Sequence, residues 1–338
     1  MRKLRLEYAF HRLIMCYNKK DESTDAHASW RDQVSPLEQL HDDVFVKAGL
    51  EVFIKRDDLL KPYGGNKWRK LKYHFLQMVD DGHREFLTFG GPFSNHIYAS
   101  ASLAREQKLD ATFFIRGSVD DRNNPVLNHV RNCGVELVSL DRKTYGNRYT
   151  QAFKSKLQSA YPGAFYIPEG GASKHGLKGC SEIVNETVKQ IGSRPDYWIV
   201  GAGTANTAAG IAGKLQANEK VIAISALRNE IIQTAFRASL GLIPVATRQR
   251  LVLSASYHFG GMAKWNEELI LFMQGFEKQH GILLDPIYTG KAMYGLYDLV
   301  TRSEFERGST IVFVHTGGMP GRMAFNYRFE GLLSDPGR

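Results

Sequence analysis

The sequence contains few cysteines, and this limits both its redox setting and its metal chemistry. Only three of its 338 residues are cysteines, Cys16, Cys133 and Cys180. They are too few and too widely spaced for a disulfide framework or a zinc site, so we expect a reducing, cytoplasmic setting. The eleven histidines show no metal-ligand spacing, and we therefore predict no metal.

Long apolar runs are also missing from the chain. No stretch approaches the length of a membrane span, and 43% hydrophobic with 23% charged residues is ordinary for a globular protein, so we expect a soluble one with no membrane partner. The first twenty residues start with basic side chains, as a signal peptide does. Glu7 and His11 interrupt any apolar core there. We interpret residues 1–30 as an N-terminal extension.

The basic residues are not gathered into one run. The formal net charge is +9, but the lysines and arginines are scattered and are not interleaved with aromatics. This distribution favours an anionic cofactor or small substrate over nucleic acid, and we predict no nucleic-acid partner.

Strand and helix patterns alternate along most of the chain. Its length predicts two domains, or one α/β domain with an added lobe. The predicted strands are 52–54, 86–89, 112–115, 135–138, 166–167, 197–200, 221–225 and 311–314. The predicted helices are 95–108, 125–132, 149–161, 176–190, 207–216, 229–240, 264–280, 291–303 and one starting near 66. Such a βαβ order predicts a parallel sheet with helices on both faces. Residues 168–173 mark the crossing from a smaller lobe back to a larger one.

Four glycine-containing turns follow predicted strands, where ligands of parallel sheets collect. The first, residues 63–72, places Lys67 at a helix start just after Gly64 and Gly65. Neighbouring Arg69 and Lys70 should lower the pKa of Lys67 and free its amine to attack a carbonyl. A basic helical turn that merely faces solvent fits these residues equally well.

The second turn, residues 90–96, joins a strand to a helix. The Ser94 hydroxyl and the N–H groups near Asn95 and His96 would suit a carboxylate. The alternative is that Ser94 is only the N-cap of the helix.

The third turn, residues 200–210, is built of small residues whose N–H groups can surround a phosphate, with hydroxyls from Thr204 and Thr207. A dinucleotide site would need an acidic residue after the next strand, but Ala226-Leu227-Arg228 stands there. Arg228 would suit a 2′-phosphate, which keeps an NADP-dependent oxidoreductase open. A single phosphate fits better.

The fourth turn, residues 315–321, places the Thr316 hydroxyl at a strand end with room for a planar ligand, while His315 is expected to be buried and satisfied by the backbone. Tyr257 and Tyr288 lie beside glycines in loops, although most tyrosines are packing residues. A lysine at a helix start, a carboxylate turn and a single-phosphate turn together describe a pyridoxal phosphate enzyme.

These turns resemble one known family. The segments 64–71, 94–96, 203–211, 284–292 and 313–318 together are similar to the 1-aminocyclopropane-1-carboxylate deaminase and D-cysteine desulfhydrase family. The resemblance covers roughly residues 33–328. It implies the tryptophan-synthase-β-like fold, with two open, mostly parallel twisted sheets. It also implies a homodimer, with a large domain of residues 31–71 plus 169–338 and a small domain of residues 72–168.

The resemblance also implies a role for each matching residue. Lys67 would be the Schiff-base lysine, Lys70 would lie near the phosphate, and Asn95 would contact the ring hydroxyl. Ser94 would bind the substrate carboxylate, with Phe93 and His96 in the same wall. The phosphate would be held by Gly203, Thr204, Ala205, Asn206 and Thr207. The substrate would be flanked by Tyr257 and Tyr288, and the ring nitrogen would face Thr316.

Two positions distinguish the activities of this family. Its deaminases carry a glutamate after the second tyrosine and a leucine before the final Gly-Gly, where this chain has Thr289 and Thr316. Threonines there are the desulfhydrase pattern, and a hydroxyl at the ring nitrogen suits β-elimination of a good leaving group. Pro92 and Phe93 depart from the family, which usually has glutamine at the second of these positions.

The resemblance therefore predicts a lyase that converts D-cysteine to pyruvate, ammonia and sulfide. Lys67 would remove the α-proton, and Tyr288 or Tyr257 would protonate the leaving sulfur. The first alternative is deamination of 1-aminocyclopropane-1-carboxylate, a hydrolase-type reaction. The others are the NADP-dependent oxidoreductase and a binding protein without catalysis.

Overall fold

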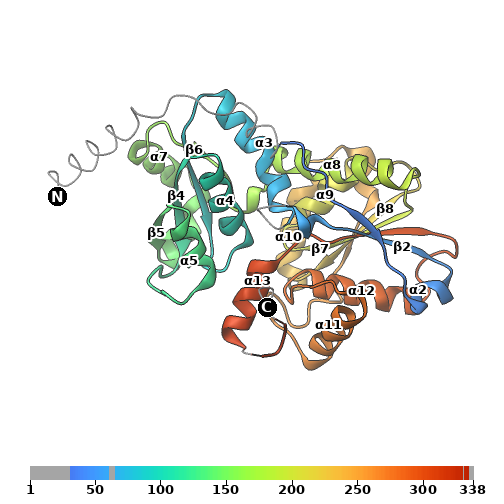
Figure 1. Ribbon diagram of the computed structural model, residues 1–338. Coiled ribbons are helices and arrows are strands. Elements are labelled where there is room, and N and C mark those ends of the chain that lie inside the picture. The colour runs from blue at the N-terminus through green and yellow to red at the C-terminus, as the bar shows by residue number, and fades with distance from the viewer. Residues whose placement is uncertain (1–30, 61–64, 330, 335–338) are drawn as a thin grey trace, which may run out of the picture. The chain divides into compact units, whose positions relative to one another are not determined.

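The computed structural model describes residues 31–60, 65–329 and 331–334. The chain divides into two compact units, Met1–Gln33 and Val34–Arg338. The predicted N-terminal extension, Cys16, and Tyr63 and Gly64 of the lysine turn lie outside the described residues. All that follows concerns the unit from Val34 to Arg338 (Figure 1).

The larger sheet has six strands and is mostly parallel, as predicted. Its order is β1 (Leu37–Gln39), β2 (Glu51–Lys55), β10 (Thr310–Val314), β7 (Tyr197–Ala202), β8 (Lys220–Ser225) and β9 (Leu251–Ser254). Only β1 pairs in the antiparallel sense. Because β10 lies between β2 and β7, the middle of this sheet is completed by the last strand of the chain.

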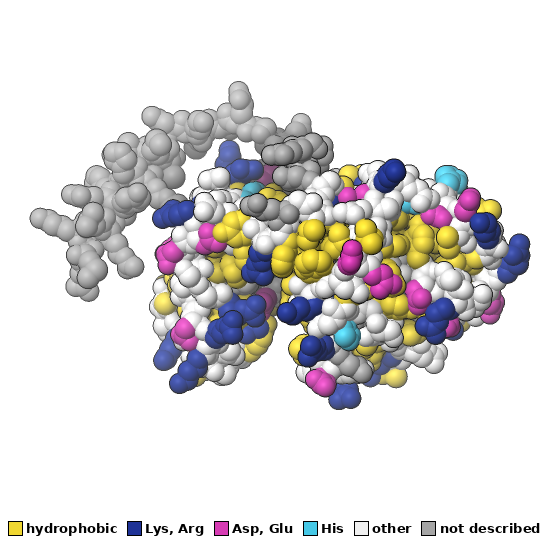
Figure 2. All heavy atoms as spheres, turned by 90° about the horizontal axis from the view of Figure 1, so that it is seen from below, with side chains coloured by type: hydrophobic (Ala, Val, Ile, Leu, Met, Phe, Trp, Pro, Cys, Tyr) yellow, Lys and Arg dark blue, Asp and Glu magenta, His cyan; other side chains and the backbone are white. Residues whose placement is uncertain are grey.

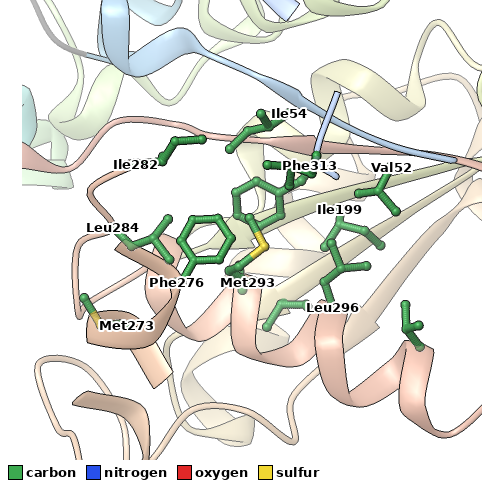
Figure 3. Packing of buried hydrophobic residues seen from close by; sticks show 14 of the residues in the cluster. Val52, Ile54, Ile199, Met273, Phe276, Ile282, Leu284, Met293, Leu296 and Phe313 are labelled. Atoms are coloured by element: carbon green, nitrogen blue, oxygen red, sulfur yellow. The ribbon is translucent and has the colours of Figure 1, made fainter. Parts of the chain in front are cut away.

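Both faces of this sheet are covered by helices, because its central strands are apolar on both sides. In β10, Ile311 and Phe313 join one core cluster while Val312 and Val314 join another. Figure 3 shows Phe313 and Ile199 of the strands against Phe276 and Met293 of the helices. The helices are α2 (Asp43–Ala48), α11 (Glu267–His280) and α12 (Thr289–Thr301) on this face, with α8 (Lys174–Ile191), α9 (Asn206–Ala212) and α10 (Asn229–Leu240) on the other.

A second sheet of four parallel strands is built from the segment between the two halves of the first. Its order is β5 (Glu136–Leu140), β4 (Asp110–Arg116), β3 (Glu85–Gly90) and β6 (Phe165–Tyr166). The helices of this segment are α4 (Asn95–Glu106), α5 (Pro125–Asn132), α6 (Arg142–Gly146) and α7 (Gln151–Ala160). This confirms the α/β class with two mostly parallel sheets. The domain boundaries at residues 72 and 168 stay a prediction.

Several short elements were not predicted from the sequence. They are α2, β1, β9, α6, α13 (Met319–Arg328) and the 3₁₀ turns η1 (Asp57–Leu59), η2 (Asn147–Tyr149), η3 (Glu169–Gly171) and η4 (Val245–Arg250). Most are too short to show periodicity. The sequence of α13 opens with Met-Pro-Gly and so suggests a loop, but proline is tolerated at a helix start, where its missing N–H is not needed.

Some predicted helix ends shift because a side chain caps the helix later. Asn266 Oδ1 accepts from the Leu269 N–H at 3.0 Å, so α11 starts at Glu267 instead of residue 264. Thr150 Oγ1 accepts from the Phe153 N–H at 3.3 Å and starts α7 at Gln151. In both cases the cap supplies an acceptor for an amide that has none within the helix.

Helix α3 (Lys67–Asp80), which starts with the candidate lysine, lies against α8 at glycines. A methyl group on Gly179 of α8 would overlap the backbone oxygen of Arg69 in α3. Neither backbone can move without separating the two helices. The absence of a side chain at Gly179 therefore sets how closely α8 approaches the first turn of α3.

Substitution of Gly179 tests this contact. Gly179→Ala should destabilise the fold by about 1–3 kcal/mol, because the added methyl overpacks the helix contact. The matched control is Gly275→Ala in α11, where nothing lies within 4 Å of an added methyl. It should stabilise by about 0.5–1 kcal/mol, since alanine favours helix over glycine. Urea unfolding midpoints measure both, and equal shifts in the two variants would contradict the close approach.

Candidate active site

One cavity gathers most of the candidate residues at the carboxyl ends of β7 and β10. Of the predicted residues, the cavity is lined by Lys67, Lys70, Asn95, Gly203, Thr204, Ala205, Asn206, Thr207, Tyr288 and Thr316. The sequence did not single out Asp285 or Gly170, which also line it. Four predicted residues, Phe93, Ser94, His96 and Tyr257, do not line it. The cavity thus brings three of the four turns together with Asn95 of the remaining one.

Lys67 is the first residue of α3, and backbone contacts to the end of β10 determine where this helix begins. The Asn66 N–H donates to the Thr316 oxygen at 3.1 Å, and Gly65 forms a β-bridge with Gly317. Gly65 has a φ of 129°, and a methyl there would overlap the Thr316 oxygen. Glycine is required because the two backbones touch. The lysine turn and the Thr316 turn are therefore one backbone unit.

The amine of Lys67 is prepared to act as a neutral base. Burial, together with the nearby Lys70 amine, lowers the pKa of Lys67 to about 7. Burial also lowers the pKa of Lys70. An amine with a pKa near neutrality is partly unprotonated at pH 7, so it can attack a carbonyl or accept a proton.

The expected contribution of Arg69 is wrong. Its guanidinium is fully buried on the other side of the helix, where it pairs with Asp57 and Glu186, each at 2.7 Å. These carboxylates raise the pKa of Arg69 and neutralise its charge. The sequence could not show this, because Asp57 and Glu186 come from η1 and α8.

The third turn has the form of an anion site. Ala205 adopts a left-handed conformation, φ 56°, and α9 begins directly after it. The first amides of a helix have no acceptor within the helix, so those of residues 206–208 are available to a ligand. Thr207 Oγ1 accepts from Asn66 Nδ2 at 2.7 Å, which joins this turn to the lysine turn.

Lys70 supplies charge beside that turn. Its side chain is only 3% exposed, and none of the described residues forms a salt bridge with its amine. Lys67 brings a second amine into the same cavity, and neither amine has a salt-bridge partner among the described residues. Burying an ammonium group without a counter-ion is costly. The site therefore favours an anionic ligand over an empty cavity.

In the second turn, residues 90–96, Ser94 is the N-cap of the helix, which was the alternative considered from the sequence. Ser94 Oγ accepts from the N–H groups of His96 and Ile97, at 3.2 and 3.5 Å, and so starts α4. A capping oxygen still carries its hydroxyl hydrogen. Asn95 Oδ1 accepts from the Gly321 N–H at 3.1 Å, which leaves its amide nitrogen to donate. The cap thus holds Ser94 and Asn95 in place and leaves each a donor.

His96 is buried and holds the second turn in place through a hydrogen bond. Thr88 Oγ1 donates to the Ile167 oxygen at 2.9 Å, so it must accept from His96 Nε2, 2.7 Å away. Burial and the charge of Lys67 hold the pKa of His96 well below its usual value. The imidazole is therefore neutral, with its hydrogen on Nε2. Its role is to fasten α4 to β3.

The two tyrosines have different places. Tyr288 lines the cavity, and its phenol packs on Gly203, where a methyl would lie 3.0 Å from Cε1. Burial and the nearby Asp285 carboxylate raise the pKa of Tyr288, so the phenol keeps its hydrogen. Tyr257 belongs to the hydrophobic core, where its hydroxyl donates to Asp298 at 2.7 Å. Tyr257 does not line the cavity, and its place beside the substrate stays a prediction.

Asp285 is the functional residue that sequence reasoning missed. One of its oxygens accepts from the Ile287 and Tyr288 N–H groups and the other accepts from Thr289 Oγ1, at 2.8–2.9 Å. Gly318 has no room for a side chain against this carboxylate. An aspartate followed by proline and a helix start was a usable signal for such a turn. Asp285 shapes the loop that presents Tyr288.

Thr316, Thr289 and His315 differ in how they relate to the cavity. Thr316 lines the cavity, whereas Thr289 is fully buried and its hydroxyl donates to Asp285. His315 Nδ1 accepts from the Gly317 N–H at 3.2 Å, and Nε2 donates to the Leu283 oxygen at 2.8 Å. The expectation that His315 is buried and satisfied by the backbone is confirmed.

A family model described as "Pyridoxal-phosphate dependent enzyme" matches residues 33–317. The chain belongs to this family. Among curated relatives, a putative 1-aminocyclopropane-1-carboxylate deaminase of Pyrococcus horikoshii is 32% identical, over 84% of this chain and 90% of that protein. A D-cysteine desulfhydrase of Klebsiella pneumoniae is 28% identical, over 82% and 90%.

Solved structures show the same fold family. The crystal structure of a homologue of 1-aminocyclopropane-1-carboxylate deaminase matches with a TM-score of 0.76 and 29% identity, over 90% of this chain and 95% of that one. A hydrogen sulfide-producing enzyme of Fusobacterium nucleatum matches with a TM-score of 0.64 at 16% identity, over 89% and 99%, which shows the fold alone. The protein is a pyridoxal phosphate-dependent enzyme with the predicted fold.

The residues of the cavity fit this cofactor. Two buried amines and the amides after Ala205 suit a phosphate, and Gly203 lets the Tyr288 ring approach that turn. The NADP alternative finds no support here, because the family model that matches residues 33–317 is that of pyridoxal phosphate-dependent enzymes. Across the described residues, no group of His, Cys, Asp and Glu is arranged to hold a metal ion, and no helix is long and apolar enough to cross a membrane.

The lowered pKa of Lys67 gives a pH-dependent stability. In cofactor-free protein the pKa of the folded lysine is about 7, whereas that of the unfolded one is the ordinary lysine value of 10.5. The unfolded state binds more protons between these values, so the contribution of Lys67 to stability rises with pH there. Lys67→Met should be more stable than wild type at pH 6. That advantage should shrink by up to about 1.4 kcal/mol per pH unit between 7 and 10.5.

Urea unfolding at several pH values measures this difference. The matched control is Lys72→Met, which removes from the same helix an amine that pairs with Glu182 at 3.0 Å. The control should show no such trend. A constant difference between wild type and Lys67→Met across the pH range would refute the lowered pKa.

Proposed function

We propose that this enzyme catalyses β-elimination on a small amino acid, of the D-cysteine desulfhydrase type. D-cysteine and water would give pyruvate, ammonium and hydrogen sulfide. The observation that carries this proposal is the neutral Lys67 amine in a cavity that also holds Asn95, Tyr288 and Thr316. An amine of this pKa can take an α-proton, and such a proton is present in D-cysteine.

The residues have separate tasks in the proposed reaction. Pyridoxal phosphate, when bound, withdraws electrons from the substrate Cα and so weakens its Cα–H bond. Lys67 removes the proton from Cα. The Ser94 hydroxyl and the Asn95 amide hold the substrate carboxylate, so that this bond stays beside the lysine. Lys70 and the amides after Ala205 balance the negative charge of the phosphate.

Tyr288 is the proposed acid for the leaving group. Burial and Asp285 raise the pKa of its phenol, so it remains protonated at neutral pH and can give its hydrogen to the departing sulfur. Tyr257, the other tyrosine considered, is removed from this role by its bond to Asp298. A single phenol therefore carries the step.

Thr316 supports elimination over ring opening. Its side chain ends in a hydroxyl and lines the cavity at the end of β10. As the group expected to face the ring nitrogen of the cofactor, this hydroxyl would leave that nitrogen less protonated than a carboxylate would, and so would give weaker electron withdrawal. That suffices to expel a good leaving group. Deamination of 1-aminocyclopropane-1-carboxylate, the activity named for the Pyrococcus relative, is the second candidate.

The proposal includes the setting of the enzyme. We place it in the cytoplasm as a homodimer, and we divide it into a small domain of residues 72–168 and a large domain. The four-stranded sheet between residues 85 and 166 supports the division into domains.

Reduction with borohydride tests the role of Lys67. The purified protein should be yellow, and borohydride should bleach it and leave the cofactor attached to Lys67, as peptide mass spectrometry would detect. Lys67→Ala should lose this attachment and about 10²–10⁴-fold in kcat, because the base is gone. Lys72→Ala, a control in the same helix with its amine paired to Glu182, should keep both. Attachment at another lysine would sink the assignment.

A substrate panel separates the two candidate activities. D-cysteine should yield pyruvate and sulfide in equal amounts, and L-cysteine should react at least tenfold more slowly. 1-Aminocyclopropane-1-carboxylate should yield no 2-oxobutyrate, because it has no α-proton for Lys67 to remove. Release of 2-oxobutyrate, with no pyruvate from D-cysteine, would replace the proposed function with the second candidate.

A further inference from the structure

A tight turn just before Ser94 carries the residues by which this chain departs from the family pattern. The Ser94 N–H donates to the Gly91 oxygen at 3.1 Å, which closes a β-turn over Gly91, Pro92, Phe93 and Ser94. Proline fixes φ at the second position of such a turn. Phe93 is thereby held at the third position, next to the serine that would bind the substrate carboxylate.

Two arginines from different elements flank this turn. The Arg328 guanidinium, at the end of α13, lies over the Phe93 ring at 4.6 Å. Nη2 of Arg116, at the end of β4, would lie 3.6 Å from a methyl on Gly91. The guanidinium groups therefore lie near the first and third residues of one four-residue turn.

Neither of these arginines forms a salt bridge with any described residue. The acidic groups nearby have other partners. Asp121 accepts from the Tyr327 hydroxyl at 3.1 Å, and Glu169 pairs with Arg148 at 2.7 Å. Figure 2 shows Lys and Arg side chains gathering on the left-hand part of the face, over the elements of the four-stranded sheet. The turn thus has uncompensated positive charge on both sides.

Arg328 is exposed, but two contacts limit where its side chain lies. The Tyr327 bond to Asp121 ties the end of α13 to the loop after β4, and the Phe93 ring supports the guanidinium face. An arginine stacked on an aromatic ring keeps its N–H edge free for an anion. The Phe93 ring is what makes that stacking possible.

We propose that Arg116 and Arg328, positioned by Phe93, select amino acids whose side chain ends in an anionic group. This inference rests on the β-elimination proposed above and specifies its substrate. Ser94 and Asn95 hold the α-carboxylate, and the two guanidinium groups bind the side-chain anion beside the same turn. For a substrate X–CH₂–CH(NH₃⁺)–COO⁻, the Cα–H and Cβ–X bonds break. With one water the products are pyruvate, NH₄⁺ and HX.

Turnover of paired substrates tests the inference on the holoenzyme. Both enantiomers of O-phosphoserine, with an anionic leaving group, are compared with those of β-chloroalanine, with a neutral side chain. For the enantiomer that reacts, kcat/KM should be at least tenfold higher with the phosphate. Arg116→Gln/Arg328→Gln should lower this ratio at least tenfold, mainly through KM, and 0.5 M salt should lower it in wild type. A ratio below one in wild type, or one unchanged in the double variant, overturns the inference.

Two further variants separate positioning from general charge. Phe93→Leu should lower the ratio and Phe93→Tyr should preserve it, because only an aromatic ring supports the Arg328 guanidinium. Lys278→Gln, which removes one exposed positive charge from α11, should leave activity and ratio unchanged. If Phe93→Leu behaves as wild type, the positioning role of Phe93 is wrong.

A binding measurement distinguishes failure here from failure of the proposed function. Succinate, with two carboxylates, and butyrate, with one, are titrated by calorimetry. Succinate should bind at least tenfold more tightly, and the double arginine variant should remove that difference. If neither amino acid yields pyruvate, the proposed elimination fails while this comparison still decides the arginines. Equal affinity for the two acids overturns the inference.

Discussion

The amines of Lys67 and Lys70 lie one helical turn apart at the cavity, none of the described residues forms a salt bridge with either, and the rest of the site depends on this. Burial alone would make such a pair unfavourable. The cost is limited because the third cation of the turn, Arg69, is removed from the cavity and neutralised by Asp57 and Glu186. The same ion pairs tie α3 to η1 and α8, so the helix cannot turn its lysines toward solvent. Because Arg69 is paired away from the cavity, only the two lysines of this helical turn are left to meet an anionic ligand.

Much of the site followed from the order of turns in the sequence. Glycines and small residues after a predicted strand, then a helix, indicate an anion site whatever the distant parts of the chain do. For this reason Lys67 and the segment from Gly203 to Thr207 could be placed in one cavity from sequence alone. The alternation of strand and helix fixed the α/β class in the same way, since both periodicities are local.

The remainder depended on contacts between distant segments. Tyr257 and Tyr288 look alike in sequence, each beside glycines, but only the structure shows that one hydroxyl already belongs to Asp298. Asp285 looks like a turn residue until three of its neighbours are seen donating to it. Elements such as β9 and α2 are held by pairing or caps over four to six residues, too few for a pattern to form. Sequence periodicity cannot report such partners.

The position of β10 in the large sheet has a consequence for how the protein is made. This strand lies between β2 and β7, so a growing polypeptide exposes two unpaired strand edges until residue 314 has left the ribosome. Thr316 and the Gly65–Gly317 bridge come later still. A cofactor pocket closed by the last tenth of the chain cannot form on a truncated product. Colour in the nascent protein would therefore mark translation beyond Gly317, and chains released before β10 would face aggregation through those open edges.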